Sequence, residues 1–138
     1  MRRRHRSSFE AELAAVPLFA ALAPEEISVI AAAATRAREP AGMLFSKEGE
    51  RGDELVIVLE GEVEVRHDGQ VLATLGPGEF VGEIALLDDG ARRTATVVAR
   101  TPVVVAYLGR YEFDRLTATN PSLLEAIEET RRRRTGGA

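Results

Sequence analysis

Residues 80–97, FVGEIALLDDGARRTATV, place a glutamate before a short predicted turn of helix and a pair of arginines after it. The turn covers residues 84–87 and breaks at the Asp-Asp-Gly of residues 88–90. Glu83 precedes it, and Arg92 and Arg93 follow it, directly before a stretch that predicts a strand. The spacing predicts that an acid and a base lie near one turn of helix.

The start of that turn is suited to binding an anion. The first N–H groups of a helix lack intrahelical partners and carry partial positive charge. Gly82 has no side chain and lets the backbone approach a ligand closely, so residues 82–85 can form a cradle. An arginine on the following strand would add a full charge and donors that grip two oxygens. These features together predict a compact phosphate site.

Glu83 indicates which kind of phosphate. A carboxylate repels a bare phosphate, but it accepts a hydrogen bond from a hydroxyl group beside the anion. A ribose phosphate carries both groups. The segment offers no Walker-type lysine and no obvious magnesium site for a polyphosphate. We therefore expect a cyclic ribose phosphate.

Each of these residues also has a simpler interpretation. Glu83 could be a first-turn acid that stabilises the helix dipole by about 0.3–1 kcal/mol. Arg93 could form a surface ion pair worth about 0–1 kcal/mol, whereas charge-assisted bonds to a ligand would contribute about 1.5–3 kcal/mol each. Gly82 could be an ordinary turn glycine. The clustering of the three residues favours a binding site.

Helices are expected on both sides of the central region. Residues 9–16 predict a short helix that stops at Pro17, and Pro24 begins a second, followed by acids that suit the helix dipole. We expect the second helix to end at residues 39–42. Its buried face is predicted at Ile27, Ile30, Ala31 and Ala34. Helical spacing returns at residues 111–116, breaks at 120–122 and resumes at 123–127.

Between residues 43 and 108 the apolar period changes to two. Residues 55–59 are continuously apolar, which suits a strand buried on both faces, and residues 62–66 alternate as in a half-exposed strand. The Asp-Gly pair at 68–69 predicts a tight hairpin that returns over 71–75. Further strands are expected at 94–100 and 103–108.

These patterns predict a mainly β fold with flanking helices. The fold class is an antiparallel β-roll (jelly-roll, double-stranded β-helix) with a short internal helix. We expect a basic N-terminal tail over residues 1–8, one domain over 9–130 and an Arg-rich C-terminal tail over 131–138. The domain would consist of helices over 9–35, a β-roll over 39–108 and C-terminal helices over 110–130.

The composition argues against several function classes. The chain has no cysteine, so neither a disulfide nor a thiolate site is available. Its two histidines, His5 and His67, are too far apart to suggest a metal site. Eight of the 18 basic residues lie in the two ends of a chain with net charge −4, so its body is acidic and no direct DNA binding is expected. No signal peptide or apolar span is seen, so a cytoplasmic location without membrane contact is expected.

The segment resembles the phosphate-binding cassette of the cyclic nucleotide-binding domain family. The family pattern reads roughly F-[GI]-G-E-[ILV]-A-L-[LMI], a few variable residues, then R-[TSA]-A-[TSV]. The chain matches it at Phe80, Gly82, Glu83, Ile84, Ala85, Leu86, Leu87, Arg93, Thr94, Ala95 and Thr96. The stretches VPLFAALAPEEI (16–27), SKEGERGDELVIVLEGEVEV (46–65) and NPSLLEAI (120–127) resemble other parts of the family, so the likeness extends from about residue 9 to 129.

The resemblance implies a role for each cassette residue. Glu83 would bind the ribose 2′-hydroxyl and Arg93 the cyclic phosphate, while the backbone of residues 82–85 would add hydrogen bonds. Thr94 would lie beside the phosphate and base, and Ala95 would complete the ligand-binding set. Val71 and Leu72 could line a base pocket, although core packing is the favoured interpretation of both.

The expected function is a regulatory module that senses a cyclic nucleotide and has no enzymatic activity. We expect cAMP to be favoured over cGMP, with no other cofactor, and a signal relayed through the C-terminal helices to an effector protein or a second copy of the chain. One alternative is a β-roll scaffold without a ligand, and another is a regulatory fragment of a larger channel, kinase or transcription regulator. A metal-dependent β-roll enzyme of the cupin type is disfavoured, because two distant histidines cannot supply its ligands.

Overall fold

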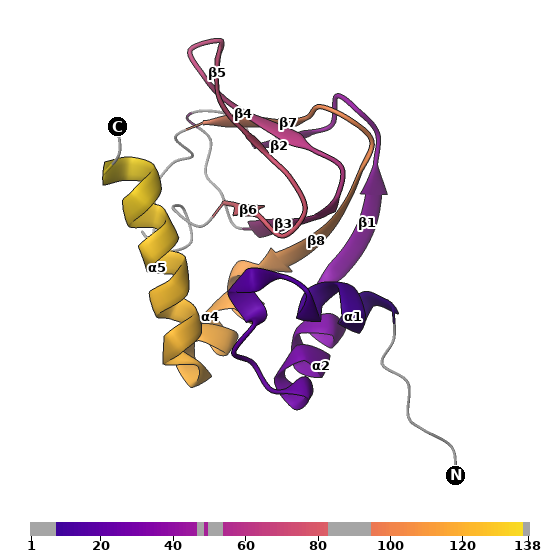
Figure 1. The fold of residues 1–138 in the computed structure, drawn as a ribbon, viewed down its shortest axis with the longest axis vertical. Helices are drawn as coiled ribbons and strands as arrows, with labels where there is room; N and C mark the ends of the chain where they lie inside the picture. The colour runs from indigo at the N-terminus through magenta and orange to yellow at the C-terminus, as the bar shows by residue number, and fades with distance from the viewer. Residues whose placement is uncertain (1–7, 47–48, 50–53, 83–94, 137–138) are drawn as a thin grey trace.

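The computed structural model describes residues 8–46, 49, 54–82 and 95–136, and it places helices at both ends of a β-roll (Figure 1). The helical elements are α1 (Ser8–Ala14), the 3₁₀ turn η1 (Pro17–Phe19), α2 (Pro24–Ala33), α4 (Arg110–Thr119) and α5 (Pro121–Gly136). As the sequence predicts, α2 begins at Pro24. There the Glu26 carboxylate accepts a hydrogen bond from the Ala23 N–H at 2.8 Å, which satisfies one of the free donors at the helix start.

The strands form two four-stranded antiparallel sheets, which confirms the predicted roll. They are β1 (Thr35–Glu39), β2 (Leu44–Ser46), β3 (Glu54–Glu60), β4 (Val63–His67), β5 (Gln70–Leu75), β6 (Phe80–Val81), β7 (Thr96–Ala99) and β8 (Val103–Gly109). One sheet has the order β1-β8-β3-β6 and the other β2-β7-β4-β5. Sequence neighbours therefore often lie in different sheets, as expected of a roll.

Two apolar cores meet at the central strands β3 and β8. On β3, Leu55 and Ile57 face the helices, whereas Val56 and Val58 face the space between the sheets. On β8, the same alternation places Ala106 and Leu108 on the helical side and Val103 and Val105 between the sheets. This double burial explains why residues 55–59 are continuously apolar, as a strand covered on both faces requires.

The β4–β5 hairpin also forms as the sequence predicts. Asp68 and Gly69, its two central residues, have φ of 50° and 78°. Positive φ at both positions is the requirement of a type I′ turn, which Asp-Gly satisfies. His67 ends β4 beside this turn with an exposed side chain, as expected.

Two expected boundaries are wrong. Helix α2 ends at Ala33 rather than at residues 39–42, because Thr35–Glu39 pair along their whole length with β8 as strand β1. The roll therefore begins at residue 35 instead of 39. Helix α5 continues to Gly136, so the arginines that we expected in a C-terminal tail lie in the helix. Arginine has high helix propensity, and positive charge near a helix C-terminus is favourable.

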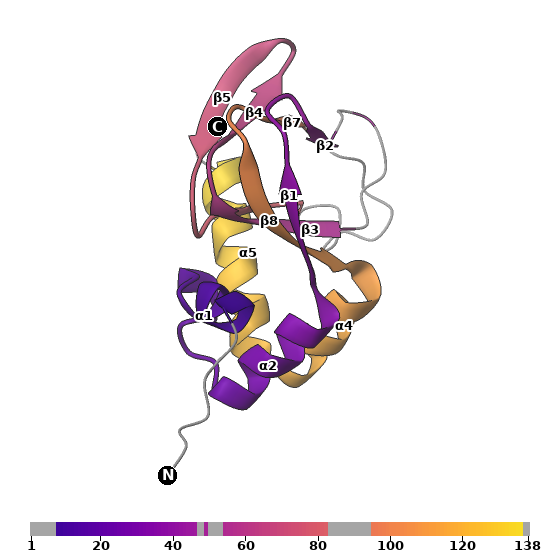
Figure 2. The same cartoon turned by 90° about the vertical axis from the view of Figure 1, so that its right-hand side faces the viewer.

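The helices gather at one end of the roll, and α5 extends from there along one side of it (Figures 1 and 2). Leu123 and Ile127 anchor α5 in the core that includes Phe19 of η1 and Phe113 of α4. The face predicted for the second helix is confirmed at Ile27 and Ile30, which are buried, while Ala31 and Ala34 are half-buried against the same core. In α4, Phe113 and Leu116 are buried. Tyr111, in contrast, is exposed.

Candidate functional site

The predicted phosphate-binding segment begins where β6 ends. Val81 and Phe80 pair with Val56 and Ile57 of β3, and their side chains enter the two cores. Gly82 follows with φ of 97°, a backbone conformation that residues with side chains rarely adopt. The backbone therefore requires a glycine at this position, whether it serves as a turn or as part of a ligand cradle.

A side-chain hydrogen bond fixes the other end of the segment. Ser46 is the only buried polar residue among those that the structure describes, and its Oγ donates to the carbonyl oxygen of Ala95 at 2.9 Å. Thr96 then begins β7, which pairs with β2 and β4. The two ends of the segment are thus held by different sheets, at Val81 and at Ala95.

Most of the predicted ligand contacts fall outside the described residues. Of the predicted site residues, Gly82, Ala95, Val71 and Leu72 are described. The range 83–94 lies outside the described residues. It contains the other predicted site residues, Glu83, Ile84, Ala85, Arg93 and Thr94, and the predicted short helix at 84–87. Their roles stay predictions.

Strand β5 is an exposed edge strand. The prediction that Val71 and Leu72 pack in the core is therefore wrong. Their exposed fractions are 52% and 62%. Val71 lies opposite Arg66, and Ala73 lies opposite Val65, so Leu72 is the extra residue of a β-bulge and has no partner across the ladder. Their part in a base pocket is still a prediction, but both side chains are accessible to a ligand.

The interior side of β5 is accessible as well. Val65 of β4 packs against the core between the sheets, and Ala73 lies directly opposite it. Residues that face each other across an antiparallel pair share one side of the sheet. Ala73 is nevertheless exposed. The roll is therefore open to solvent beside the middle of β5.

A tyrosine and a glutamate add a polar pair next to the core between the sheets. The Tyr107 hydroxyl donates to Glu39 Oε2 at 2.6 Å, and its ring lies 6.2 Å from that of Phe45. Partial burial, and then the hydrogen bond to Glu39, raise the pKa of Tyr107. The phenol consequently stays neutral at physiological pH and can donate its hydrogen bond to Glu39.

Sequence reasoning missed Ser46 and the Tyr107–Glu39 pair. Ser46 and Ala95 are 49 positions apart, and Tyr107 and Glu39 are 68 apart, so no local pattern connects them.

Over the described part of the chain, no three His, Cys, Asp or Glu side chains are close enough to hold a metal ion. None of the described helices has both the length and the apolar character needed to cross a bilayer.

Comparison with known proteins gives the same family as the sequence motif. A family model described as the cyclic nucleotide-binding domain matches residues 38–120, a range that includes the whole candidate segment. A cyclic nucleotide-gated potassium channel from Mesorhizobium japonicum is 39% identical over 126 residues, which are 91% of this chain and 35% of the channel. A cAMP-dependent protein kinase regulatory subunit from Emericella nidulans is 38% identical over 129 residues, 92% of this chain and 31% of the subunit.

A solved structure shares the fold. The regulatory subunit of a cAMP-independent protein kinase A from Trypanosoma brucei superposes with a TM-score of 0.80 at 30% identity, over 89% of this chain and 46% of the subunit. This chain spans about a third of the length of the two curated relatives, at 35% and 31%. The likeness to all three proteins is a likeness to one region of each.

Proposed function

Because this chain belongs to the cyclic nucleotide-binding domain family, we propose that it binds a cyclic nucleotide through residues 82–95 and acts as a regulatory module. The observation that carries the proposal is the match of residues 38–120 to that family, together with the cassette residues Glu83 and Arg93 within it. The described ends of the segment support it, since Gly82 has the backbone of a close turn and Ala95 is held by Ser46.

In this proposal each end of the ligand meets a group of matching chemistry. Arg93 binds the cyclic phosphate with charge-assisted hydrogen bonds, helped by the backbone N–H groups of residues 82–85. Glu83 accepts a hydrogen bond from the ribose 2′-hydroxyl. Val71 and Leu72 contact the base from the exposed edge of β5, where apolar side chains are available.

We favour cAMP over cGMP as the ligand. The Emericella relative is named as the regulatory subunit of a cAMP-dependent kinase, whereas the trypanosomal protein is the regulatory subunit of a kinase described as cAMP-independent. Proteins that differ in their dependence on cAMP therefore share this fold. In this proposal the cassette residues, and not the fold, determine whether cAMP binds. A β-roll scaffold without a ligand is the second candidate, which the trypanosomal example favours.

The relay of the signal is part of the same proposal. Helix α5 is anchored through Leu123 and Ile127 and extends along the roll, so a shift in its packing would present a changed surface to an effector protein or a second copy. A ligand shifts such an equilibrium only through a difference in affinity for the two arrangements.

Thermal unfolding with four nucleotides tests the ligand. A ligand at about a hundred times its dissociation constant stabilises the folded state by about 2.7 kcal/mol. We expect a clear rise in melting temperature with cAMP, a smaller rise with cGMP and little change with 5′-AMP, whose phosphate is not cyclic. 2′-Deoxy-cAMP should give a reduced shift because Glu83 loses its partner. No shift with either cyclic nucleotide would favour the scaffold.

A further inference from the structure

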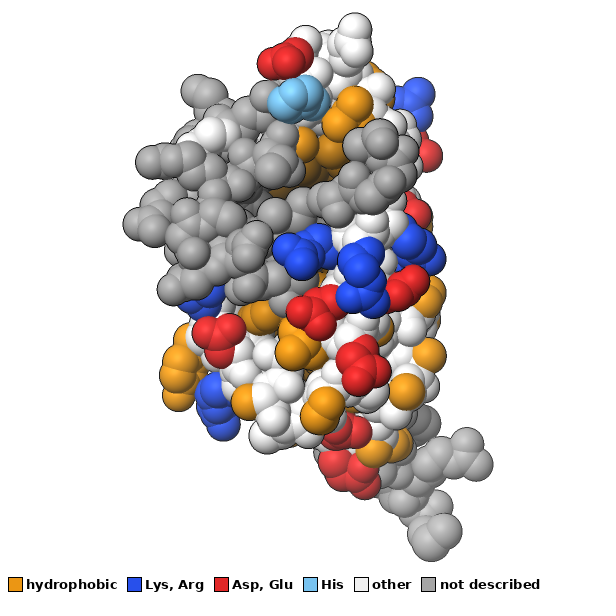
Figure 3. Space-filling view, turned by 90° about the vertical axis from the view of Figure 1, so that its left-hand side faces the viewer, with side chains coloured by type: hydrophobic (Ala, Val, Ile, Leu, Met, Phe, Trp, Pro, Cys, Tyr) orange, Lys and Arg blue, Asp and Glu red, His pale blue; other side chains and the backbone are white. Residues whose placement is uncertain are grey.

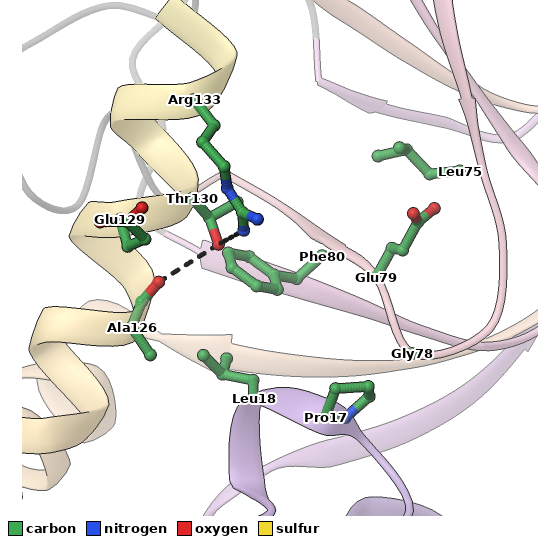
Figure 4. Close-up of a pocket in the computed structure, with 10 residues that line it drawn as sticks. All are labelled: Pro17, Leu18, Leu75, Gly78, Glu79, Phe80, Ala126, Glu129, Thr130 and Arg133. Atoms are coloured by element: carbon green, nitrogen blue, oxygen red, sulfur yellow. Dashed lines mark hydrogen bonds between the residues drawn. The ribbon is translucent and has the colours of Figure 1, made fainter.

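A cavity of about 610 Å³ lies between α5, η1 and the turn that leads from β5 to β6 (Figure 4). Four residues of α5 line it: Ala126, Glu129, Thr130 and Arg133. They follow the i, i+3, i+4, i+7 spacing of one helix face. Leu123 and Ile127 pack in the core, whereas this neighbouring face of α5, from Ala126 to Arg133, lines an open space.

The opposite wall of the cavity is apolar apart from Glu79. Leu18 of η1, Leu75 of β5 and Phe80 of β6 contribute to it, together with Pro17. Figure 4 shows the Arg133 side chain reaching from α5 toward Thr130 and Phe80. The cavity thus combines an apolar surface with one cationic group, Arg133, and two carboxylates, those of Glu79 and Glu129. Its volume lies within the range of about 300–1,000 Å³ that is usual for small-molecule sites.

The two carboxylates of the lining already have partners. Glu79 Oε2 accepts the N–H of Gly76 at 2.8 Å, and Glu129 Oε2 accepts from Arg132 Nη2 at 2.8 Å. The hydrogen bond from Arg132, followed by the charges of Arg132 and Arg133, lowers the pKa of Glu129. Figure 3, which faces the side of the molecule that carries α5, shows arginine side chains among acidic ones.

Arg133 has most of its donors available. Its Nη2 donates to Thr130 Oγ1 at 3.3 Å, and it forms no salt bridge with any residue that the structure describes. A guanidinium carries five N–H donors in a planar fork that matches the two oxygens of a carboxylate. The group in this cavity that still lacks a full set of partners is therefore the cation.

We propose that this cavity binds a small amphipathic monoanion, with an aliphatic chain on the apolar wall and a carboxylate on Arg133. The four described residues of the proposed nucleotide site, Gly82, Ala95, Val71 and Leu72, are not among its lining residues. A ligand in it would touch η1, the β5–β6 turn and α5 together. Its binding would favour the arrangement in which α5 lies against the roll.

Octanoate is a suitable probe. Its binding is measured from changes in amide chemical shifts during a titration of the whole chain. Saturable shifts are expected at Gly78, Ala126 and Thr130. Butyrate should bind more weakly, because each methylene removed from an apolar surface costs about a fourfold loss in affinity. Octylamine, with the same chain and the opposite charge, should give no saturable shift at these amides.

Arg133→Gln supplies the decisive variant. It removes the cation at an exposed position near the helix end, and octanoate affinity should fall at least about tenfold, the effect of losing a charge-assisted bond. Arg115→Gln on α4 removes the same charge away from the cavity and should leave affinity unchanged. The proposal is overturned by an absence of saturable shifts, by equal binding of octylamine, by wild-type affinity in Arg133→Gln, or by shifts confined to Gly82 and Ala95.

Discussion

Gly61 shows how a single residue fixes the contact between two turns of the roll. It lies between β3 and β4 with φ of 85°, and a Cβ built there would come within 2.3 Å of the Pro102 carbonyl oxygen and 2.8 Å of Thr101 Oγ1. The neighbouring N–H of Glu62 donates to Thr101 Oγ1 at 3.0 Å. A side chain at residue 61 would therefore force the β3–β4 and β7–β8 turns apart.

We expect Gly61→Ala to destabilise the protein by about 3 kcal/mol or more. Left-handed backbone costs a side-chain-bearing residue about 1–2 kcal/mol, and forced overlap in a packed region costs about 1–3 kcal/mol. Gly69→Ala is the matched control, since Gly69 has φ of 78° but nothing within 4 Å of its Cβ position. Urea unfolding of both variants measures the difference. Equal losses would show that the contact with the β7–β8 turn is unimportant.

At the same scale, the sequence predicts some site residues far better than others. Gly82 could be singled out because its neighbours form a motif, and its φ of 97° requires a glycine. Ser46 could not, because its hydrogen bond to Ala95 depends on how β2 meets β7. The prediction that Leu72 packs in the core is wrong for a related reason. Its apolar type favours burial, but its position in a bulge of an edge strand exposes it.

Between elements, one ion pair connects α1 to the roll. Arg36 of β1 donates from Nε to Glu12 Oε1 at 2.7 Å and from Nη2 to Oε2 at 3.0 Å. The hydrogen bonds from Arg36 lower the pKa of Glu12 below its ordinary value of 4.5. The side chains are 31% and 24% exposed, so the pair is only partly screened by solvent.

Glu12→Gln should lower the free energy of unfolding at neutral pH by about 1 kcal/mol, the upper end for exposed pairs. Because the folded pKa of Glu12 is depressed, the contribution is present above about pH 4.5 and is lost as pH falls through the folded value. Unfolding curves of the wild type and the variant should therefore converge in acid.

Glu125→Gln, at an exposed position of α5, controls for the loss of one negative charge. We expect it to leave stability nearly unchanged at every pH. A difference between wild type and Glu12→Gln that stays constant as the pH falls well below 4.5 would contradict the ion-pair account, because a protonated Glu12 can no longer form the pair.

Element boundaries separate what local sequence can predict from what it cannot. The β4–β5 hairpin and the start of α2 follow from Asp68-Gly69 and from Pro24, which act locally. Strand β1 could not be predicted, because its polar sequence TRARE is that of an edge strand paired with β8 and has no apolar alternation. The arginines of α5 were expected in a tail because charged runs are often solvated, but the helix that precedes them continues.

For the whole molecule, one apolar core connects the start of the candidate segment to the C-terminal helices. Phe80 lies in the core of the helices and Val81 in the core between the sheets, directly before Gly82. Ile127 of α5 belongs to the same core as Phe80. A displacement of the segment after Val81 would therefore act on packing that includes α5. This continuity is a physical basis for the proposed relay.

The most direct measurement of the central claim is a calorimetric titration of cAMP into the wild type and two neighbouring arginine variants. The account predicts saturable binding to the wild type and to Arg92→Ala, because the family pattern is matched by Arg93 and not by Arg92. Arg93→Ala should bind at least about tenfold more weakly, since it loses charge-assisted bonds to the phosphate, while its unfolding transition stays cooperative. Wild-type affinity in Arg93→Ala, or no binding of cAMP or cGMP to the wild type, would contradict the account.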